Sequence, residues 1–316
     1  MITTEEFKLA YIFLLGREPE QEALTPTSLA YYKNVEHLRG EIVRTPEFRE
    51  RATLMLNSER EEWIFKNIGN NRYLPLCLSD LGVSLPILWR NSWEPETTTA
   101  ILNRLHKDSC FVDVGANIGW FSIKAADFFQ QSGGTGLVYV FEPQRKICTN
   151  LAQAAQLSGL TSYLNINAVA VGNDFAPCQM QSKLALGNLG GSFVTNSPLA
   201  DIEYVPTVKL DYALAQLQRL DVIKIDIEGS ELNALRGGSK ILERFLPDIF
   251  IELNAEMLQA VGSTSPLEVY QFLREFGYSC FLVEDAETRA QCLSEQDVFE
   301  ITNRRNYPNF LFTCRY

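Results

Sequence analysis

The stretch FVDVGANIGW, residues 111–120, combines an apolar run, an acid and two glycines four residues apart. The apolar residues before Asp113 predict a buried strand, and those after Gly119 recur at helical spacing. A tight turn joins the two elements, either because a ligand approaches the backbone there or because the strand and the helix pack closely. Short glycine motifs often match by chance, so this stretch alone leaves both explanations open.

Beyond this stretch the chain alternates predicted strands and helices. Strands are expected over residues 110–114, 136–143, 164–172, 221–229, 247–254 and 278–284, with helices over 119–129, 146–159, 211–220, 230–245 and 265–277. Strands that are linked by helices predict a parallel sheet with right-handed crossovers, covered by helices on both faces. We therefore expect residues 96–316 to form an α/β domain with a Rossmann-like, doubly wound, mostly parallel sheet and a loop-rich stretch over residues 173–206.

The N-terminal part of the chain has a different pattern. Apolar residues recur there at three- and four-residue spacing, which predicts a helix whose first turn Thr3 or Thr4 can cap. Thr45, followed by a proline, predicts the start of a later helix. Residues 61–95 hold several prolines and three tryptophans with little periodicity. We expect a small all-α domain over residues 1–60, followed by a linker with short strands or turns.

The composition limits the kinds of partner. With 46% apolar and 21% charged residues, the 316-residue chain can bury a substantial core. Its formal charge of −11 disfavours a nucleic-acid partner, because binding to a phosphate backbone depends on basic side chains. The seven cysteines include no C-x-x-C pair, which is typical of neither a disulfide framework nor a zinc site. No signal-peptide pattern and no apolar run of roughly 20 residues is present, so we predict a cytoplasmic protein without membrane insertion.

Four of the predicted strands end in carboxylates. Asp113, Glu142 and Glu252 each lie at the end of one strand, and Asp226 with Glu228 lie at the end of another. The carboxyl ends of parallel strands meet at one edge of a sheet, and ligands bind outside that edge. A buried carboxylate is costly unless it is paired or hydrogen-bonded. Acids at four strand ends therefore indicate a ligand site rather than a set of helix caps.

The spacing of the glycines limits the ligand. A dinucleotide-binding turn has the pattern G-x-G-x-x-G, whereas this chain has G-x-x-x-G, which disfavours a pyrophosphate. Glu142 is expected to accept hydrogen bonds from both hydroxyls of a ribose. A nucleoside without phosphates fits best, and S-adenosylmethionine is such a ligand. The residues expected to bind this cofactor are Asp113, Gly115, Ala116, Asn117, Gly119, Glu142 and Asp226.

Several motifs together resemble the FkbM family of S-adenosylmethionine-dependent methyltransferases. In chain order they are FVDVGANIGWFSIKAA, VYVFEPQ, NAVAVGN, DVIKIDIEGSELNALRGG and PDIFIELN, all within residues 96–280. The combination of residues 113–119 with residues 224–229 is highly specific. The resemblance implies the methyltransferase fold and an O-methyltransferase that acts on a hydroxyl of a sugar, a glycan or a polyketide-like small molecule.

The acids after the fourth and fifth strands are the candidates for catalysis. Methyl transfer to an alcohol requires the alignment of two reactants and a base for one proton. We expect Asp226 near the sulfonium and the acceptor, Glu228 as either the base or a helix-capping acid, and Glu252 as a third candidate. Lys224 is expected as a buried partner of these acids. His106 precedes the first strand, where a surface role explains it better than a catalytic one.

Two residues are candidates for binding the acceptor. Ser192 lies in the stretch GNLGGSF at residues 187–193, which either orders over the substrate or is a plain surface loop. Asn254 follows the fifth strand. Asp226, Glu252 and Asn254 imitate the magnesium ligands of catechol-type methyltransferases. A Glu-x-Asn spacing replaces the usual adjacent pair, however, so we predict no metal site.

The N-terminal helices resemble a small module found beside enzymes of surface-glycan synthesis, through residues 13–19 and 45–48. They are also a candidate surface for homo-oligomer formation. Two rival functions stay open for the chain: a non-catalytic cofactor-binding or scaffold protein of the same fold, and a nicotinamide-dependent reductase. The spacing of the glycines argues against the reductase.

Overall fold

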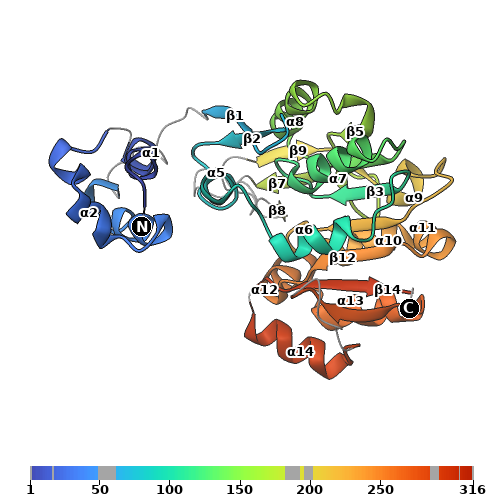
Figure 1. Ribbon diagram of the computed structural model, residues 1–316. Helices are drawn as coiled ribbons and strands as arrows, with labels where there is room; N and C mark the ends of the chain where they lie inside the picture. Colours follow the sequence, from blue (N-terminus) through green and yellow to red (C-terminus); the bar gives the residue numbers. More distant parts are fainter. Residues whose placement is uncertain are drawn as a thin grey trace. The chain divides into compact units, whose positions relative to one another are not determined.

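The computed structural model describes residues 2–15, 18–48, 62–181, 193–195, 202–284, 292–305 and 307–314. The chain forms two compact units, Met1–Glu61 and Glu62–Tyr316 (Figure 1). The boundary falls between the helical N-terminal segment and the first strand of the chain. Each unit is described by itself.

The smaller unit is helical over its described residues. It contains α1 (Thr4–Leu15), the 3₁₀ helix η1 (Gln21–Leu24), α2 (Pro26–Tyr31) and α3 (Val35–Ile42). Thr3 caps α1: its hydroxyl oxygen accepts from the backbone N–H of Glu6, and the Glu6 carboxylate accepts from the N–H of Thr3. The Thr45 hydroxyl likewise accepts from the N–H of Phe48, as expected for a helix start. Residues 49–61, where that helix was expected to continue, lie outside the described residues.

The larger unit is built on a seven-stranded sheet in the order β13-β14-β12-β11-β3-β4-β5. Five neighbouring strands are parallel: β5 (Leu164–Asn167), β4 (Leu137–Phe141), β3 (Cys110–Val114), β11 (Val222–Ile225) and β12 (Asp248–Glu252). The strand β14 (Asn309–Thr313) lies antiparallel between β12 and β13 (Ser279–Leu282). The prediction of an α/β fold with a doubly wound, mostly parallel sheet is confirmed.

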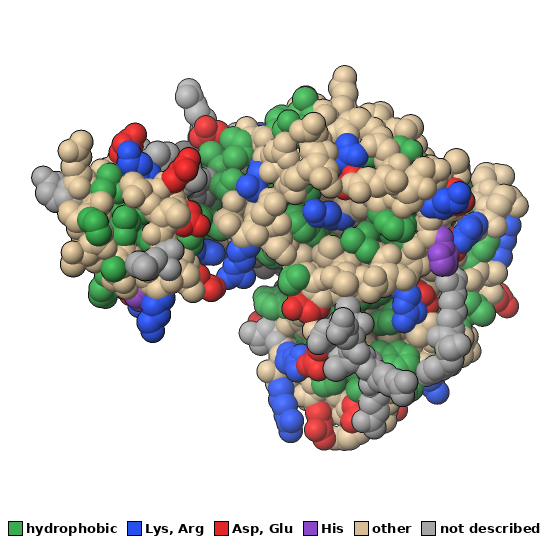
Figure 2. All heavy atoms as spheres, in the orientation of Figure 1, with side chains coloured by type: hydrophobic (Ala, Val, Ile, Leu, Met, Phe, Trp, Pro, Cys, Tyr) green, Lys and Arg blue, Asp and Glu red, His purple; other side chains and the backbone are tan. Residues whose placement is uncertain are grey.

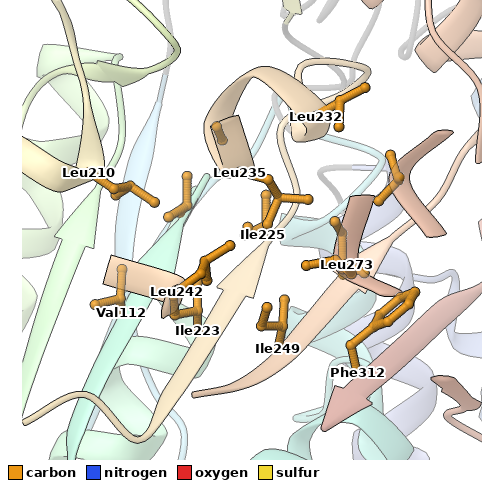
Figure 3. Close-up of a cluster of buried hydrophobic side chains, with 14 of the residues drawn as sticks. Val112, Leu210, Ile223, Ile225, Leu232, Leu235, Leu242, Ile249, Leu273 and Phe312 are labelled. Carbon is orange, nitrogen blue, oxygen red and sulfur yellow. The ribbon is translucent and has the colours of Figure 1, made fainter. Parts of the chain in front are cut away.

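Helices cover both faces of the sheet. The helices of this unit include α6 (Pro95–Leu102), α7 (Trp120–Gln131), α8 (Arg145–Leu157), the 3₁₀ helix η2 (Thr161–Tyr163), α10 (Glu231–Gly237), α11 (Ser239–Phe245), α12 (Ala255–Met257), the π-helical turn η4 (Leu258–Gly262), α13 (Pro266–Glu275) and α14 (Glu295–Arg304). Alternate residues of a strand point to opposite faces, so Val112 and Ile223 enter one core and Phe111 and Val222 enter the other. Figure 3 shows the first of these cores, where strand side chains meet Leu235 and other helix residues.

Residues 62–95, expected as a linker with short strands or turns, belong to the larger unit. They form the antiparallel strands β1 (Trp63–Asn67) and β2 (Tyr73–Cys77) and the helix α5 (Ser84–Arg90). Arg72, between the two strands, donates to the Asp127 carboxylate at 2.5 Å and to the backbone carbonyl of Ser158 at 2.6 Å. These bonds attach the hairpin to helices α7 and α8.

Four predicted elements differ from the structure. The single helix expected over residues 230–245 is two helices, α10 and α11. The single strand expected over residues 164–172 is two strands, β5 and β6 (Ala170–Val171), and β6 pairs with β10 (Thr207–Val208) outside the main sheet. The stretch expected to be rich in loops contains β7 (Cys178–Gln181), β8 (Phe193–Thr195) and β9 (Ile202–Val205), which form an antiparallel sheet. The helix expected over residues 211–220 is confined to α9 (Leu210–Ala213).

None of the described helices is long and apolar enough to cross a membrane. On the face that Figure 2 presents, Lys and Arg side chains are interspersed with Asp and Glu side chains. The absence of a nucleic-acid partner stays a prediction from the net charge.

Candidate active site

A cavity of about 400 Å³ lies at the carboxyl ends of β3, β11 and β12. Its walls come from the turn after β3, the turn after β11, the end of β12, the segments before α5 and α6, and the start of β14. The lining residues are Gly82, Val83, Trp93, Glu94, Gly115, Ala116, Asn117, Ile118, Trp120, Phe121, Lys224, Asp226, Glu228, Glu252, Tyr307 and Asn309. Seven residues singled out from the sequence therefore meet in one cavity, namely Gly115, Ala116, Asn117, Lys224, Asp226, Glu228 and Glu252.

The first glycine of the turn permits close packing of two strand ends. Gly115 has φ +78°, and a Cβ atom built on it would lie 1.9 Å from the carbonyl oxygen of Asp226. Backbone hydrogen bonds join these turns to the ends of neighbouring strands. The N–H of Gly115 donates to the carbonyl of Phe141 at the end of β4, and the N–H of Asp226 donates to the carbonyl of Val114 at the end of β3. The turns that follow β3 and β11 are thus in direct contact, and the backbone of the first turn also faces the cavity.

The second glycine permits close packing of two helices. Gly119 has φ +83° at the N-cap of α7, and a Cβ atom there would lie 2.3 Å from the side chain of Leu151 on α8. Both glycines therefore have a packing role, which is one of the two explanations that the sequence left open. Gly119 is not part of the cavity wall, so its expected contact with a cofactor stays a prediction.

Asp113 and Glu142 are not part of the cavity wall. Asp113 is fully buried, and one of its carboxylate oxygens accepts from the Ser122 hydroxyl at 2.6 Å. Its other oxygen has no hydrogen-bond partner among the described residues. Burial raises the pKa of Asp113, and the positive charge of Lys224 opposes that rise.

Glu142 connects the turn after β3 with the turn after β4. One carboxylate oxygen accepts from the backbone N–H of Asn117 and the other from that of Gln144, each at 2.9 Å. The side chain is 4% exposed, and burial raises its pKa to about 7 although both hydrogen bonds oppose the rise. The carboxylate therefore organises the walls around the cavity. Its expected bond to a ribose stays a prediction.

The burial of Glu142 predicts a measurable pH dependence. Because the pKa rises from 4.5 to about 7 on folding, the native state binds more protons than the unfolded state in this interval, and stability falls as the pH rises through it. Relative to Glu142→Gln, the wild-type free energy of unfolding should fall by about 3 kcal/mol between pH 4 and pH 8. Urea unfolding at both pH values measures this difference. The variant Glu275→Gln, at an exposed helical position, is the control; equal pH dependence of the wild type and Glu142→Gln would contradict the expectation.

Among the described residues, Lys224 is the single basic residue of the cavity wall. It is 3% exposed, its ammonium lies 2.9 Å from the Asp226 carboxylate, and it sits 4.7 Å from the centre of the Phe121 ring. Burial disfavours its charged form, but the carboxylates of Asp226, Glu94 and Asp113 outweigh burial and raise its pKa. The predicted buried partnership between Lys224 and the strand-end acids is present in the structure.

Glu94 is a site residue that the sequence reasoning missed. It precedes Pro95 in a left-handed backbone conformation, with φ +37°, and its carboxylate accepts from the Asn309 side chain at 3.1 Å. Burial raises its pKa, Lys224 opposes the rise, and Asp226 adds to it. Its one signal in the sequence is the proline after it, which marks a helix start but says nothing of a site.

Glu94, Asp226 and Glu252 converge from three different elements. One carboxylate oxygen from each lies within 4.8 Å of the others, a spacing that would admit a cation. Burial raises the pKa of Glu252 well above its usual range, and the charges of Asp226 and Glu94 add to the rise. Four acids line the cavity against one lysine, so the wall carries an excess of negative charge that favours a positively charged group.

Glu231 holds the turn that carries Asp226 and Glu228. Its carboxylate accepts from the backbone N–H groups of Ile227 and Gly229, each at 3.1 Å. Burial raises its pKa to about 7. Glu231, which was not singled out from the sequence, therefore holds the backbone of this turn by hydrogen bonds. Glu228, with φ +51°, lines the cavity.

The remaining candidates lie elsewhere or outside the described residues. The side-chain oxygen of Asn254 caps α12 by accepting from two backbone N–H groups, and Asn254 is not in the cavity wall. Ser192 lies outside the described residues, so its role in acceptor binding stays a prediction, as does that of Asn254. His106 is exposed and precedes β3, whereas the cavity lies after that strand.

The main sheet has one antiparallel strand near its edge, and the cavity lies at the carboxyl ends of its central strands, as in an α/β protein of the Rossmann-like class. Residues 113–280 match the family model described as the methyltransferase FkbM domain. This match covers more than half of the 316 residues, and the chain belongs to that family. The resemblance of residues 1–60 to a glycan-associated module lies outside the match and stays a prediction.

Three solved structures are among those similar to this chain. A methyltransferase FkbM from Methylobacillus flagellatus KT is 16% identical with a TM-score of 0.43, and the match covers 96% of this chain and 58% of that one. A precorrin-6y C5,15-methyltransferase from Geobacter metallireducens GS-15 is 12% identical over 71% of this chain and 88% of that one, with a TM-score of 0.39. A SAM-dependent O-methyltransferase from Thermotoga maritima is also 12% identical, over 71% of this chain and 68% of that one, with a TM-score of 0.39.

The chain therefore spans 58% of the length of the first of these proteins. None of the curated proteins matches the chain.

Proposed function

We propose that the protein is an O-methyltransferase that uses S-adenosylmethionine and acts on a hydroxyl of a sugar, a glycan or a polyketide-like small molecule. The observation that carries the proposal is the cavity in which the glycine turn after β3 meets the acids after β11 and β12. Membership of the FkbM methyltransferase family supports it.

The residues present fit this cofactor. A cavity of about 400 Å³ is in the range of small-molecule sites. The side-chain oxygen of Asn117, in the cavity wall, is buried and has no hydrogen-bond partner among the described residues, so it can accept from a ligand. The acidic wall suits the positive charges of the sulfonium and the amino group. Asn117, Asp226 and the backbone at Gly115 and Ala116 would hold the ligand.

The bound cofactor would supply a methyl group already activated by its sulfonium. The protein then has to align the acceptor hydroxyl with that methyl group and to remove one proton. Asp226, Glu228 and Glu252 all line the cavity, as a base or an orienting acid must. Asp226 pairs with Lys224 at 2.9 Å and belongs to the acidic wall that suits the cationic side of the cofactor.

Thermal unfolding with added ligands tests the cofactor. S-adenosylmethionine or its demethylated product at about 100 times its Kd should stabilise the native state by about 2.7 kcal/mol and raise Tm, because it binds the folded state alone. NAD(H) should leave Tm unchanged. A rise with NAD(H) and none with S-adenosylmethionine would contradict the proposal and favour a reductase. Binding of S-adenosylmethionine without methyl transfer to any acceptor would favour a scaffold protein.

A further inference from the structure

A second cavity adjoins the first. It has a volume of about 340 Å³ and shares three wall residues with the first cavity, namely Glu94, Tyr307 and Asn309. The hydrogen bond from the Asn309 side chain to the Glu94 carboxylate lies in this shared wall. Among the described residues, Glu94 is the one carboxylate that lines both cavities.

The wall of the second cavity combines polar groups with one aromatic face. Glu96 lies on the first turn of α6, and Glu284 and Arg305 form an ion pair. The Tyr307 ring is 61% exposed, so one face is open to a ligand. Carboxylates accept from hydroxyl groups and a guanidinium donates to them, while an aromatic ring packs against the apolar face of a saturated ring. This set of groups suits a neutral compound with several hydroxyls.

We propose that the second cavity binds the methyl acceptor, a neutral polyhydroxylated compound, and that Glu94 removes the proton of the reacting hydroxyl. The proposal rests on the methyltransferase function proposed above and adds the place of the acceptor and the identity of the base. A bond forms between the acceptor oxygen and the methyl carbon as the carbon–sulfur bond breaks. The bonding pair stays on sulfur, which becomes neutral, and the hydroxyl proton passes to the Glu94 carboxylate and then to solvent.

The other acids of the first cavity are less suited to this step. Asp226 is already engaged in an ion pair with the Lys224 ammonium at 2.9 Å, and it lines the first cavity and not the second. Glu228 and Glu252 line the first cavity alone. Only a group in the shared wall can touch a hydroxyl that enters from one cavity and a methyl group that is presented from the other.

Two variants separate acceptor binding from proton removal. Glu96→Trp, at an exposed position on α6, should narrow the second cavity and raise the acceptor KM about 10-fold or more, with cofactor Kd unchanged. Asn103→Trp, at an exposed position at the other end of α6, is the control and should change neither. Glu94→Gln keeps an oxygen for the bond from Asn309 and should lower kcat about 10²–10⁴-fold, the usual range for loss of a general base, with cofactor Kd within a few-fold.

The assay follows the transfer of a labelled methyl group from S-adenosylmethionine to the polar small-molecule extract of the source cells. If Glu96→Trp raised the cofactor Kd as much as the acceptor KM, the proposal of a separate acceptor pocket would be overturned. A wild-type protein that binds S-adenosylmethionine but labels nothing in the extract would also overturn it. Wild-type turnover in Glu94→Gln would overturn the base. If EDTA abolished methyl transfer and Mg²⁺ restored it, the acids would act through a cation. That result would also overturn the assignment of Glu94 as the base. No response of the wild type to S-adenosylmethionine would instead refute the proposed function.

Discussion

Asp226→Asn is expected to lower cofactor affinity about 10–100-fold and to lower single-turnover transfer at saturating cofactor by less than Glu94→Gln does. The affinity figure corresponds to one lost hydrogen bond to a charged group, about 1.5–3 kcal/mol. The substitution also removes the ion-pair partner of Lys224, which is 3% exposed. Stability should fall by at most about 3 kcal/mol, the lower end for an unpaired buried charge, because Glu94 and Asp113 stay near the ammonium. Calorimetric titration, single-turnover transfer and urea unfolding measure the three effects.

A double-mutant cycle separates the contact with the cofactor from the ion pair. Lys224→Met removes the charge that Asp226 balances, and the double variant leaves no uncompensated charge in the pair. If Asp226 contacts the cofactor, the double variant should regain stability but not cofactor affinity. Recovery of both would show that Asp226 serves only as the partner of Lys224.

Gly115→Ala is expected to destabilise the larger unit by about 2–5 kcal/mol. About 1–2 kcal/mol comes from placing a Cβ atom in a left-handed conformation, at φ +78°. A further 1–3 kcal/mol, roughly, comes from the displacement needed to relieve a Cβ contact of 1.9 Å with the Asp226 carbonyl. The contact is with backbone, which cannot rotate away as a side chain can. Urea unfolding measures the loss, and cofactor binding should fall with it because both turns line the cavity.

Gly159→Ala is the matched control for this substitution. Gly159 also has a positive φ, +66°, but no atom lies within 4 Å of a Cβ atom built on it. The control should therefore lose only the conformational part, about 1–2 kcal/mol. Equal losses in the two variants would mean that the contact between the turns is not tight.

The strands and helices that the sequence predicted well are those with local signals. Buried strands such as β3 and β11 are continuous apolar runs, and the helices after them carry apolar residues at helical spacing. The short strands β7, β8 and β9 were missed because they are held by pairing between distant segments, as between Gln179 and Tyr204. The insertion of β14 between β12 and β13 is likewise a pairing of distant segments.

The sequence by itself determined the sheet that carries the site. Acids and glycines directly after parallel strands must gather at one edge, because the carboxyl ends of such strands coincide, and Gly115, Asp226 and Glu252 do meet in the cavity. Only the tertiary structure decided which of those residues face the cavity and what completes its wall. The Glu142 carboxylate accepts hydrogen bonds from backbone N–H groups and does not line the cavity. Glu94 and Asn309, which are 215 positions apart, form a hydrogen bond near Lys224. Such contacts depend on how separate elements pack, and no periodicity or spacing within one segment encodes that arrangement.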